Sequence, residues 1–236
     1  MTLPPNVHVS IHPCVLAKLS RLRSQSTPAR EVKTLVHDIA SIIACEAFAT
    51  SLTAADGPMD TTPMGFEYTT TTISPRSISL VPILRSGLGM IEAVQQLLPD
   101  SVPVHHLGLY RDPTTLTSVE YYNNLPNHLA ISPSASATSP EHAAGGPSEL
   151  AIVVDPVIAT GGTCAAAIQT LREWGVQRIV VLSVIAAAEG LRRAAQQWGE
   201  GTQFYVAGVD AELTDKGMLK PGLGDVGDRL FLTIGK

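Results

Sequence analysis

The stretch that decides the fold runs Ala151-Ile-Val-Val-Asp-Pro-Val-Ile-Ala-Thr-Gly-Gly-Thr163. Its first four residues are apolar, as in a strand that helices bury on both faces of a parallel sheet. Gly161 and Gly162 then lack Cβ atoms, so consecutive backbone N–H groups can turn toward one anion. A helical pattern of apolar residues follows and ends at Gly175. We therefore predict a phosphate site at a helix N-terminus, where free N–H groups and the helix dipole favour negative charge.

Two other phosphate-binding patterns do not fit this loop. The ATP-binding pattern requires Gly-Lys followed by Ser or Thr, whereas Thr163 is followed by Cys164 with no Lys nearby. The dinucleotide pattern Gly-x-Gly-x-x-Gly also fails, because Gly161 and Gly162 are adjacent. What remains is Asp155 at the strand end, which can accept hydrogen bonds from a sugar diol while the loop holds a phosphate. Ribose 5-phosphate is the ligand that this pairing fits.

The composition favours one α/β domain. A chain of 236 residues with 44% hydrophobic content can bury one substantial core, and we do not expect a second full domain. The net charge of −5 disfavours general attraction to nucleic acid or anionic membranes. No apolar run has the length of a membrane span, and the N-terminus lacks a signal-peptide pattern. The three cysteines are widely spaced, which argues against a disulfide framework or a zinc site, so we expect a cytoplasmic protein.

Units of strand, turn and helix recur along the chain. The predicted strands are 79–84, 104–110, 119–122, 151–154, 178–185 and 203–210, and the predicted helices are about 28–49, 88–98, 164–174 and 189–198. This order predicts a doubly wound, mainly parallel sheet, with ligands at the carboxyl ends of its strands. We interpret 50–77 as loops with one short exposed strand, and about 130–149 as a mobile insertion rich in Ser, Ala and Pro.

Four segments, taken together and in this order, resemble the uracil phosphoribosyltransferases, a group of the type I phosphoribosyltransferases. They are Val81-Pro-Ile-Leu-Arg-Ser-Gly-Leu-Gly-Met90, Leu107 to Pro113 with Val119 to Pro126, Asp155 to Thr163, and Lys220-Pro-Gly-Leu-Gly-Asp-Val-Gly-Asp-Arg229. A weaker echo is Ile11-His-Pro13. The resemblance covers nearly the whole chain apart from the insertion. It implies one phosphoribosyltransferase domain over 1–236, with a β-hairpin arm and a small hood over the base site.

The activity that this resemblance implies belongs to pyrimidine salvage. Uracil and 5-phosphoribosyl 1-diphosphate (PRPP) would give uridine monophosphate (UMP) and pyrophosphate. Mg²⁺ is the implied cofactor, held mainly by substrate oxygens and water rather than by a protein metal site. The family also implies a homodimer or homotetramer, for which we expect the apolar face of the helix at 28–49 to provide an interface, and purine nucleotides act as effectors in some relatives.

Two departures from the family pattern affect the expected shape of the pocket, and one of them keeps an alternative open. Ala188 stands where the family usually has Pro, and Met218 stands where it usually has Tyr. Met218 is the departure that favours the alternative. The alternative is a sensor of the same fold that binds ribosyl phosphates or UMP without catalysis. A transferase for another base is a third reading, which the segment from Gly222 to Arg229 disfavours.

The resemblance assigns the site residue by residue. Arg85, Asp155 and Asp225 are the implied catalytic residues. The implied PRPP-binding residues are Arg85, Arg111, Asp155, Pro156, Val157, Ile158, Ala159, Thr160, Gly161, Gly162, Thr163 and Asp225. Uracil is assigned to Leu219, Gly224, Asp225 and Val226. The fixed charge of Arg85 suits pyrophosphate, and Arg111 opens a hairpin that would fold over the donor. We expect Asp228 to bridge Arg229 and Cys164 to pack.

Overall fold

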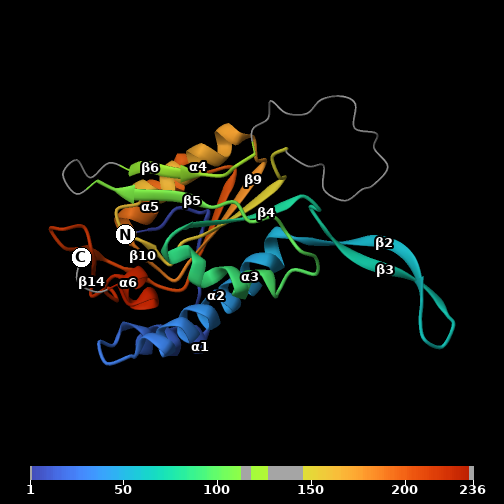
Figure 1. The fold of residues 1–236 in the computed structure, drawn as a ribbon, viewed down its shortest axis with the longest axis horizontal. Helices are drawn as coiled ribbons and strands as arrows, with labels where there is room; N and C mark the ends of the chain where they lie inside the picture. The colour runs from blue at the N-terminus through green and yellow to red at the C-terminus, as the bar shows by residue number, and fades with distance from the viewer. Residues whose placement is uncertain (1, 113–117, 127–145, 234–236) are drawn as a thin grey trace.

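The computed structural model describes residues 2–112, 118–126 and 146–233, and a seven-stranded sheet lies at its centre (Figure 1). In spatial order its strands are β1 (Val7–Val9), β11 (Thr202–Val206), β9 (Arg178–Ser183), β7 (Leu150–Val154), β4 (Ile78–Leu84), β5 (Leu107–Arg111) and β6 (Ser118–Asn123). Neighbours from β1 to β5 pair in parallel, whereas β6 pairs antiparallel to β5. The predicted doubly wound, mainly parallel sheet is confirmed.

Helices cover both faces of this sheet (Figure 1). One face carries α1 (Pro13–Arg23) and α2 (Ala29–Ser51), and the other carries α4 (Gly162–Trp174) and α5 (Ala188–Gln197). Ile152 and Val154 of β7 join the core on the α2 side, while Ala151 and Val153 join the core on the α4 side. This two-sided burial explains why the strand is apolar at every position.

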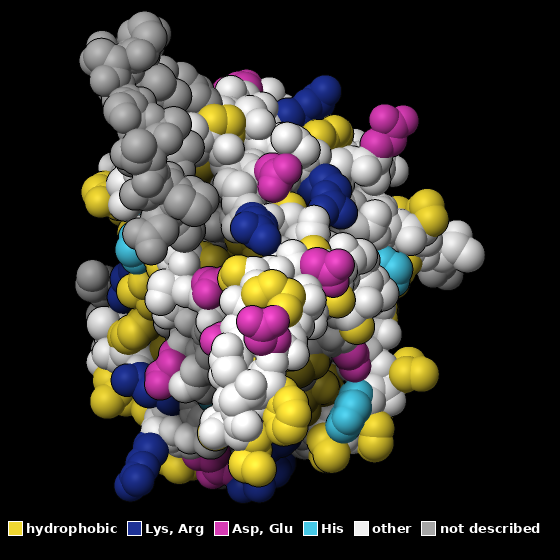
Figure 2. Space-filling view, turned by 90° about the vertical axis from the view of Figure 1, so that its right-hand side faces the viewer, with side chains coloured by type: hydrophobic (Ala, Val, Ile, Leu, Met, Phe, Trp, Pro, Cys, Tyr) yellow, Lys and Arg dark blue, Asp and Glu magenta, His cyan; other side chains and the backbone are white. Residues whose placement is uncertain are grey.

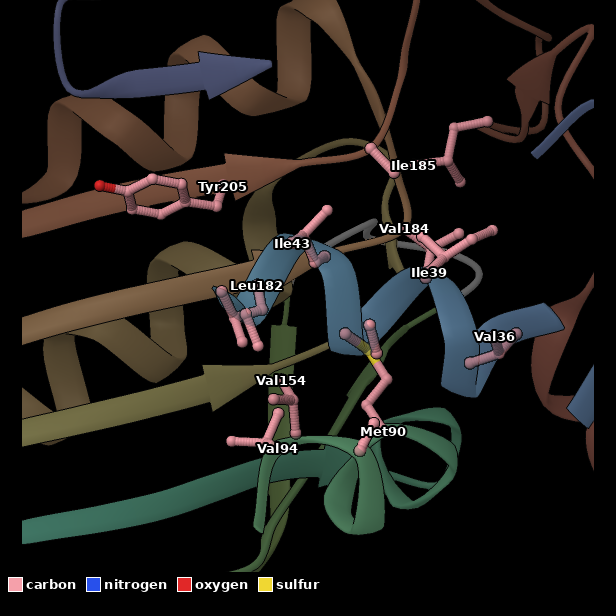
Figure 3. Close-up of a cluster of buried hydrophobic side chains, with 14 of the residues drawn as sticks. Val36, Ile39, Ile43, Met90, Val94, Val154, Leu182, Val184, Ile185 and Tyr205 are labelled. Carbon is pink, nitrogen blue, oxygen red and sulfur yellow. The ribbon is translucent and has the colours of Figure 1, made fainter. Parts of the chain in front are cut away.

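The apolar face of α2 is part of the core. Figure 3 shows Ile39 and Ile43 of this helix gathered with Leu182, Val184 and other buried side chains. These four side chains are fully buried. The expectation that this helix face provides an interface between subunits was therefore wrong, because the sheet already covers it.

Shorter elements continue the chain beyond the carboxyl ends of the central strands. A second parallel sheet contains β8 (Val157–Ile158), β10 (Ile185–Ala187) and β12 (Val209–Asp210). The hairpin of β13 (Glu212–Leu213) and β14 (Leu219–Lys220) then leads to α6 (Val226–Phe231). In Figure 1, β14 and α6 lie together at one end of the molecule.

Two regions differ from the sequence predictions. Residues 50–77 form a long antiparallel hairpin of β2 (Thr53–Thr61) and β3 (Glu67–Ser74), which projects from the body as an arm (Figure 1). Most positions of both strands are exposed, so the alternation that marks a half-buried strand is missing. The helix predicted at 88–98 begins instead as the 3-10 turn η1 (Ser86–Met90), and its α-helical part, α3 (Ile91–Gln95), is short.

Two further predictions concern segments that the structure covers only in part. The insertion at about 130–149 lies mostly outside the described residues, as does the tip of the β5–β6 hairpin. Within the described residues, no helix is both long and apolar enough to cross a membrane.

Candidate active site

A cavity of about 370 Å³ opens at the carboxyl ends of β4 and β7, beside the β5–β6 hairpin. It collects segments that are far apart in the sequence. The predicted site residues in its lining are Arg85, Asp155, Val157, Ile158, Ala159, Thr160, Gly161, Thr163, Gly224, Asp225 and Val226. Pro156, Gly162 and Leu219 are not among its lining residues. Leu219 is 9% exposed and belongs to the hydrophobic core. Arg111 ends β5, and its side chain lies outside the described part of the chain.

The loop between β7 and α4 packs closely against the start of α5, and a glycine on each side, Gly161 and Gly190, makes this close contact possible. Gly161 precedes α4 with a φ of 76°, in the left-handed region that favours glycine. A Cβ on Gly161 would lie 2.1 Å from the carbonyl oxygen of Gly190, and a Cβ on Gly190 would lie 1.9 Å from that of Ala159. The loop is therefore packed directly against the first turn of α5. Because Gly161 has no side chain at the N-cap position, the first N–H groups of α4 are available to an anion.

Asp155 lies at the floor of the cavity and is 6% exposed. Its Oδ1 atom accepts hydrogen bonds from Ser86 Oγ at 3.3 Å and from the backbone N–H of Val157 at 3.4 Å. Burial raises the pKa of Asp155 to about 7, although both hydrogen bonds act to lower it. The carboxyl group therefore changes its charge near neutral pH.

Cys164 lies beside Asp155 at the start of α4 and is 1% exposed. Burial, and then the nearby charge of Asp155, raise the pKa of the Cys164 thiol well above its usual range. The side chain belongs to the hydrophobic core under α4, which confirms the prediction that it packs.

Arg85 follows β4 directly and reaches across to the C-terminal segment. Its Nη2 atom lies 3.2 Å from Asp228 Oδ1, and its Nη1 atom donates to Thr233 Oγ1 at 3.1 Å. We expected Asp228 to bridge Arg229. Instead Asp228 pairs with Arg85, while Arg229 donates to backbone carbonyl oxygens. About half of the Arg85 side chain is exposed, so its charge is accessible from the cavity.

Asp225 lines the cavity from the C-terminal segment. It is the N-cap residue of α6, and its Oδ1 atom accepts from the backbone N–H of Asp228 at 3.0 Å. The turn before it needs Gly224, whose φ is 78°. Backbone from Gly224 to Gly227 thus lines one wall of the cavity, and Met218 adds a side chain that is 40% exposed.

Sequence reasoning missed several lining residues. Tyr110 and Tyr121 stand on the β5–β6 hairpin with their ring centroids 6.0 Å apart, and both line the cavity. A Cβ on Gly108 would lie 2.8 Å from the Tyr121 ring, so this glycine allows the ring to lie across the hairpin. Ser86 also lines the cavity and donates to Asp155. Both tyrosines lie in segments that carry the family resemblance. The position of their rings, however, depends on the pairing of β5 with β6, which the sequence does not show.

Comparisons with known proteins agree with this geometry. The family model described as uracil phosphoribosyltransferase matches residues 9–233. Proteins named uracil phosphoribosyltransferase from Roseiflexus castenholzii and Finegoldia magna are 40% and 39% identical over 227 residues, covering 96% of this chain and 98% of each relative. The solved structure of AQ2163 protein from Aquifex aeolicus has a TM-score of 0.81 at 28% identity, and the match covers 96% of this chain and 98% of that one.

A more distant solved structure shares the fold alone. Adenine phosphoribosyl transferase from Trypanosoma brucei has a TM-score of 0.52 at 12% identity, over 92% of this chain and 90% of that one. The sheet and its helices thus form the fold of the type I phosphoribosyltransferases. The chain belongs to the uracil phosphoribosyltransferase family.

Proposed function

We propose that the cavity is where this chain, as a member of its family, carries out the conversion of uracil and PRPP to UMP and pyrophosphate. The observation that carries the proposal is that Arg85, Asp155 and Asp225, from three distant segments, line one cavity. The relatives are named as transferases, so no observation favours the sensor alternative.

The loop from Asp155 to Thr163 is the proposed site for the ribose 5-phosphate part of PRPP. The phosphate would lie against the N-terminus of α4, where N–H groups and the helix dipole attract an anion. Asp155, once ionised, would accept hydrogen bonds from the ribose hydroxyl groups next to it. Because Asp155 is buried, these bonds would form in a setting that excludes most water, which strengthens them.

Arg85 is the proposed contact for the departing pyrophosphate. As the bond between ribose C1 and the pyrophosphate oxygen breaks, the pyrophosphate leaves with the bonding electrons and C1 gains positive character. The uracil N1 atom then bonds to C1 and releases its proton. Arg85 would exchange its present partners, Asp228 and Thr233, for the leaving group, and its planar guanidinium suits phosphate oxygens. Arg111 and the tyrosines of the β5–β6 hairpin would cover the donor and exclude water.

The wall from Gly217 to Gly227 is the proposed uracil site. Uracil is small and flat, with donors and acceptors at its edge, and backbone groups near Gly224, Asp225 and Val226 can approach that edge closely. Leu219 differs from these residues because its side chain is buried in the core. We propose that it anchors the segment, while its neighbour Met218 borders the base.

Mg²⁺ is the proposed cofactor. The described part of the cavity offers two carboxylates as ligands for it but no complete metal site made of protein side chains. Within the described residues, no group of three or more His, Cys, Asp or Glu side chains is placed to hold a metal ion. Among the described residues, Asp155 and Asp225 are the carboxylates that line the cavity, and they offer the hard oxygen ligands that Mg²⁺ prefers. When bound, Mg²⁺ would neutralise charge on the diphosphate, with substrate oxygens and water completing its shell.

Base selection tests the proposed function. The purified chain would be given PRPP and Mg²⁺ with uracil, cytosine, hypoxanthine or adenine, and nucleotide formation would be followed for each base. We expect product with uracil, and cytosine to be rejected because its amino group reverses the donor pattern at one edge. Equal or faster turnover of another base would overturn the assignment of uracil.

Replacement of Gly190 by alanine tests whether the contact with α5 shapes the PRPP loop. The new Cβ would lie 1.9 Å from the Ala159 carbonyl oxygen, so the loop must shift. Since displacements of about 1 Å can cost on the order of 100-fold in rate, we expect kcat/KM for PRPP to fall by at least about tenfold. Gly199→Ala is the control, because its Cβ would make an ordinary contact at 3.6 Å. Unchanged kinetics in Gly190→Ala would contradict this account of the loop.

We also propose that the chain forms a homodimer or homotetramer through the β2–β3 arm. Apolar side chains are exposed along this arm, among them Met64 at 81% and Phe66 at 69%. Figure 2 looks at the side from which the arm projects and shows hydrophobic side chains exposed among polar ones. Burying these apolar side chains against a second copy of the chain would lower the free energy of the protein.

Charged substitutions on the arm should therefore dissociate the assembly. In light scattering, the wild type is expected at a multiple of the chain mass, and a variant with both Met64→Asp and Phe66→Asp as a monomer. Ile11→Asp is the control, because Ile11 is 88% exposed but lies outside the arm. A monomeric wild type, or a double variant that keeps the wild-type mass, would exclude the arm as the interface.

A cytoplasmic location is a separate proposal, supported by the cysteines. All three are free thiols, and two of them, Cys14 and Cys45, are exposed. Exposed free thiols are typical of a reducing compartment.

A further inference from the structure

Arg23, at the C-terminal end of α1, holds the segment that precedes Asp225. Its Nη2 atom lies 2.6 Å from Asp210 Oδ1, and its Nη1 atom lies 3.0 Å from Asp210 Oδ2. The same Nη1 atom donates to the carbonyl oxygen of Gly222 at 2.8 Å. In return, the N–H of Gly222 donates to Asp210 Oδ2 at 2.8 Å. Both backbone polar groups of Gly222 are thus held by one ion pair, whose carboxylate is 4% exposed.

A second arginine makes a parallel connection on the other side of Gly222. Arg229, in α6, donates through Nη1 to the carbonyl oxygens of Leu22 at 2.6 Å and Leu223 at 2.7 Å. Its Nη2 atom donates to the carbonyl oxygen of Ser24 at 3.0 Å. The end of α1 and the backbone at Leu223 therefore share one guanidinium group.

The segment from Gly217 to Gly227, which we call the held segment, contributes one wall of the cavity. The side chains that hold it do not line the cavity. Gly217, Met218 and the backbone from Gly224 to Gly227 line the cavity, but Arg23, Asp210 and Arg229 do not. The hairpin strands β13 and β14 that introduce this segment have two residues each, so regular pairing fixes little of it. At Gly222 the φ is 65°, and a Cβ would lie 2.3 Å from the Leu219 carbonyl oxygen.

We propose that Arg23, Asp210 and Arg229 are positioning residues for the base: they set the backbone that meets the edge of uracil. This inference rests on the proposed function of the cavity. Hydrogen bonds weaken steeply when donor and acceptor are misaligned, so a base that is read by backbone groups needs that backbone fixed closely. The bonds described above end on backbone atoms of Gly222 and Leu223, immediately before Gly224.

A general stabilising role would give a different pattern. Buried ion pairs are poor evidence for stability, because desolvation offsets much of their attraction. A pair that only joined α1 to β12 would not need to hold both the N–H and the carbonyl of Gly222. A positioning role predicts that loss of the pair affects uracil selectively, whereas a stabilising role predicts lower stability without a change in substrate preference.

The first test uses Asp210→Asn and Arg23→Lys. Asparagine keeps one acceptor oxygen, so it cannot serve both the Arg23 fork and the Gly222 N–H. Lysine keeps the charge but cannot reproduce the planar fork. We expect KM for uracil to rise by about tenfold or more in both variants, with kcat and KM for PRPP within about twofold of the wild type. Arg229→Lys is a third variant, which weakens the hold on the same segment at Leu223. It tests the proposal if the Asp210 variant does not fold.

The control is Lys18→Met, which removes another ion pair of α1. Lys18 Nζ lies 2.6 Å from Asp38 Oδ2, and this pair joins α1 to α2 without touching the held segment. It should lower the melting temperature somewhat and leave KM for uracil unchanged. An equal rise of KM for both substrates, or the same rise in Lys18→Met, would overturn the proposal.

Amide hydrogen exchange of the ligand-free protein separates this proposal from the proposed function. We expect faster exchange in peptides covering 217–227 in Asp210→Asn and Arg23→Lys, but not in Lys18→Met. Unchanged exchange in the first two variants would overturn the positioning role, whether or not the wild type turns over uracil. An inactive wild type would instead count against the proposed function, and the exchange result would still decide the positioning role.

Discussion

Replacement of Arg85 by alanine is expected to lower kcat/KM by about 100- to 1000-fold, the usual effect of removing one group that stabilises charge in a transition state. The pyrophosphate gains negative charge as it leaves, and Arg85 is the cavity-lining side chain with a fixed positive charge at the end of β4. Folding should change little. About half of the arginine side chain in the Arg85–Asp228 ion pair is exposed, and surface ion pairs contribute about 0–1 kcal/mol.

The measurement is steady-state kinetics together with urea unfolding. Arg76→Ala is the matched control, because Arg76 is an exposed arginine just before β4, whereas Arg85 follows the strand at its other end. It should keep wild-type turnover. Arg85→Lys should recover part of the activity, since it restores the charge without the planar fork. Wild-type turnover in Arg85→Ala would remove Arg85 from the mechanism.

Replacement of Asp155 by asparagine is expected to impair catalysis while stabilising the ligand-free protein above neutral pH. Burial raises the pKa of this carboxyl from 3.8 to about 7, so between these values the folded chain holds a proton that the unfolded chain has released. Folded-state stability therefore falls as pH rises through that window. The resulting penalty is about 4 kcal/mol at pH 8 and about 2 kcal/mol at pH 5. Asparagine has no such penalty and still offers an oxygen to Ser86 and Val157.

Urea unfolding at pH 8 and pH 5 measures this difference, and kinetics measure the loss of turnover. We expect the variant to gain more stability at pH 8 than at pH 5 and to lose at least about 100-fold in kcat/KM for PRPP. Asp225→Asn is the control for stability, because Asn serves as an exposed N-cap as well as Asp does. An Asp155→Asn protein that is less stable than the wild type at pH 8 would contradict the assigned burial cost.

The same carboxyl group should give the enzyme a pH dependence. In the proposed complex with PRPP, the ionised form of Asp155 would accept hydrogen bonds from both ribose hydroxyl groups through its two oxygens. We therefore expect kcat/KM for PRPP to rise as pH increases through about 7. This rise should be missing in Asp155→Asn, which links the kinetic profile to the residue that causes it.

The core of the fold could be predicted because its signals are local. Ala151 to Val154 are apolar at every position since both faces of β7 are covered, and Gly175 ends α4 with a φ of 105°, which favours glycine. The lining role of Arg85, Asp155 and Asp225 followed from motifs that keep their order along the chain. Each of these residues lies at the end of a strand or at the start of a helix that borders the same cavity.

The rest depended on contacts between distant segments. The β2–β3 arm is exposed on both faces and so lacks the alternating pattern of a half-buried strand. Gly190 had no motif that linked it to the loop from Asp155 to Thr163, because its role is to let the Ala159 carbonyl approach. Arg23 and Asp210 are 187 positions apart, and nothing in either neighbourhood indicates the other. Contacts between residues so far apart in the sequence can be identified only from the folded structure.

The reaction of the wild-type protein tests the central claim most directly. Purified protein would be incubated with labelled uracil, PRPP and Mg²⁺, and UMP and pyrophosphate would be measured in the same samples. The account predicts that both products appear in equal amounts and that neither forms without PRPP. Binding of UMP with no product from uracil would contradict it, and would identify the chain as a nucleotide-binding protein rather than a transferase.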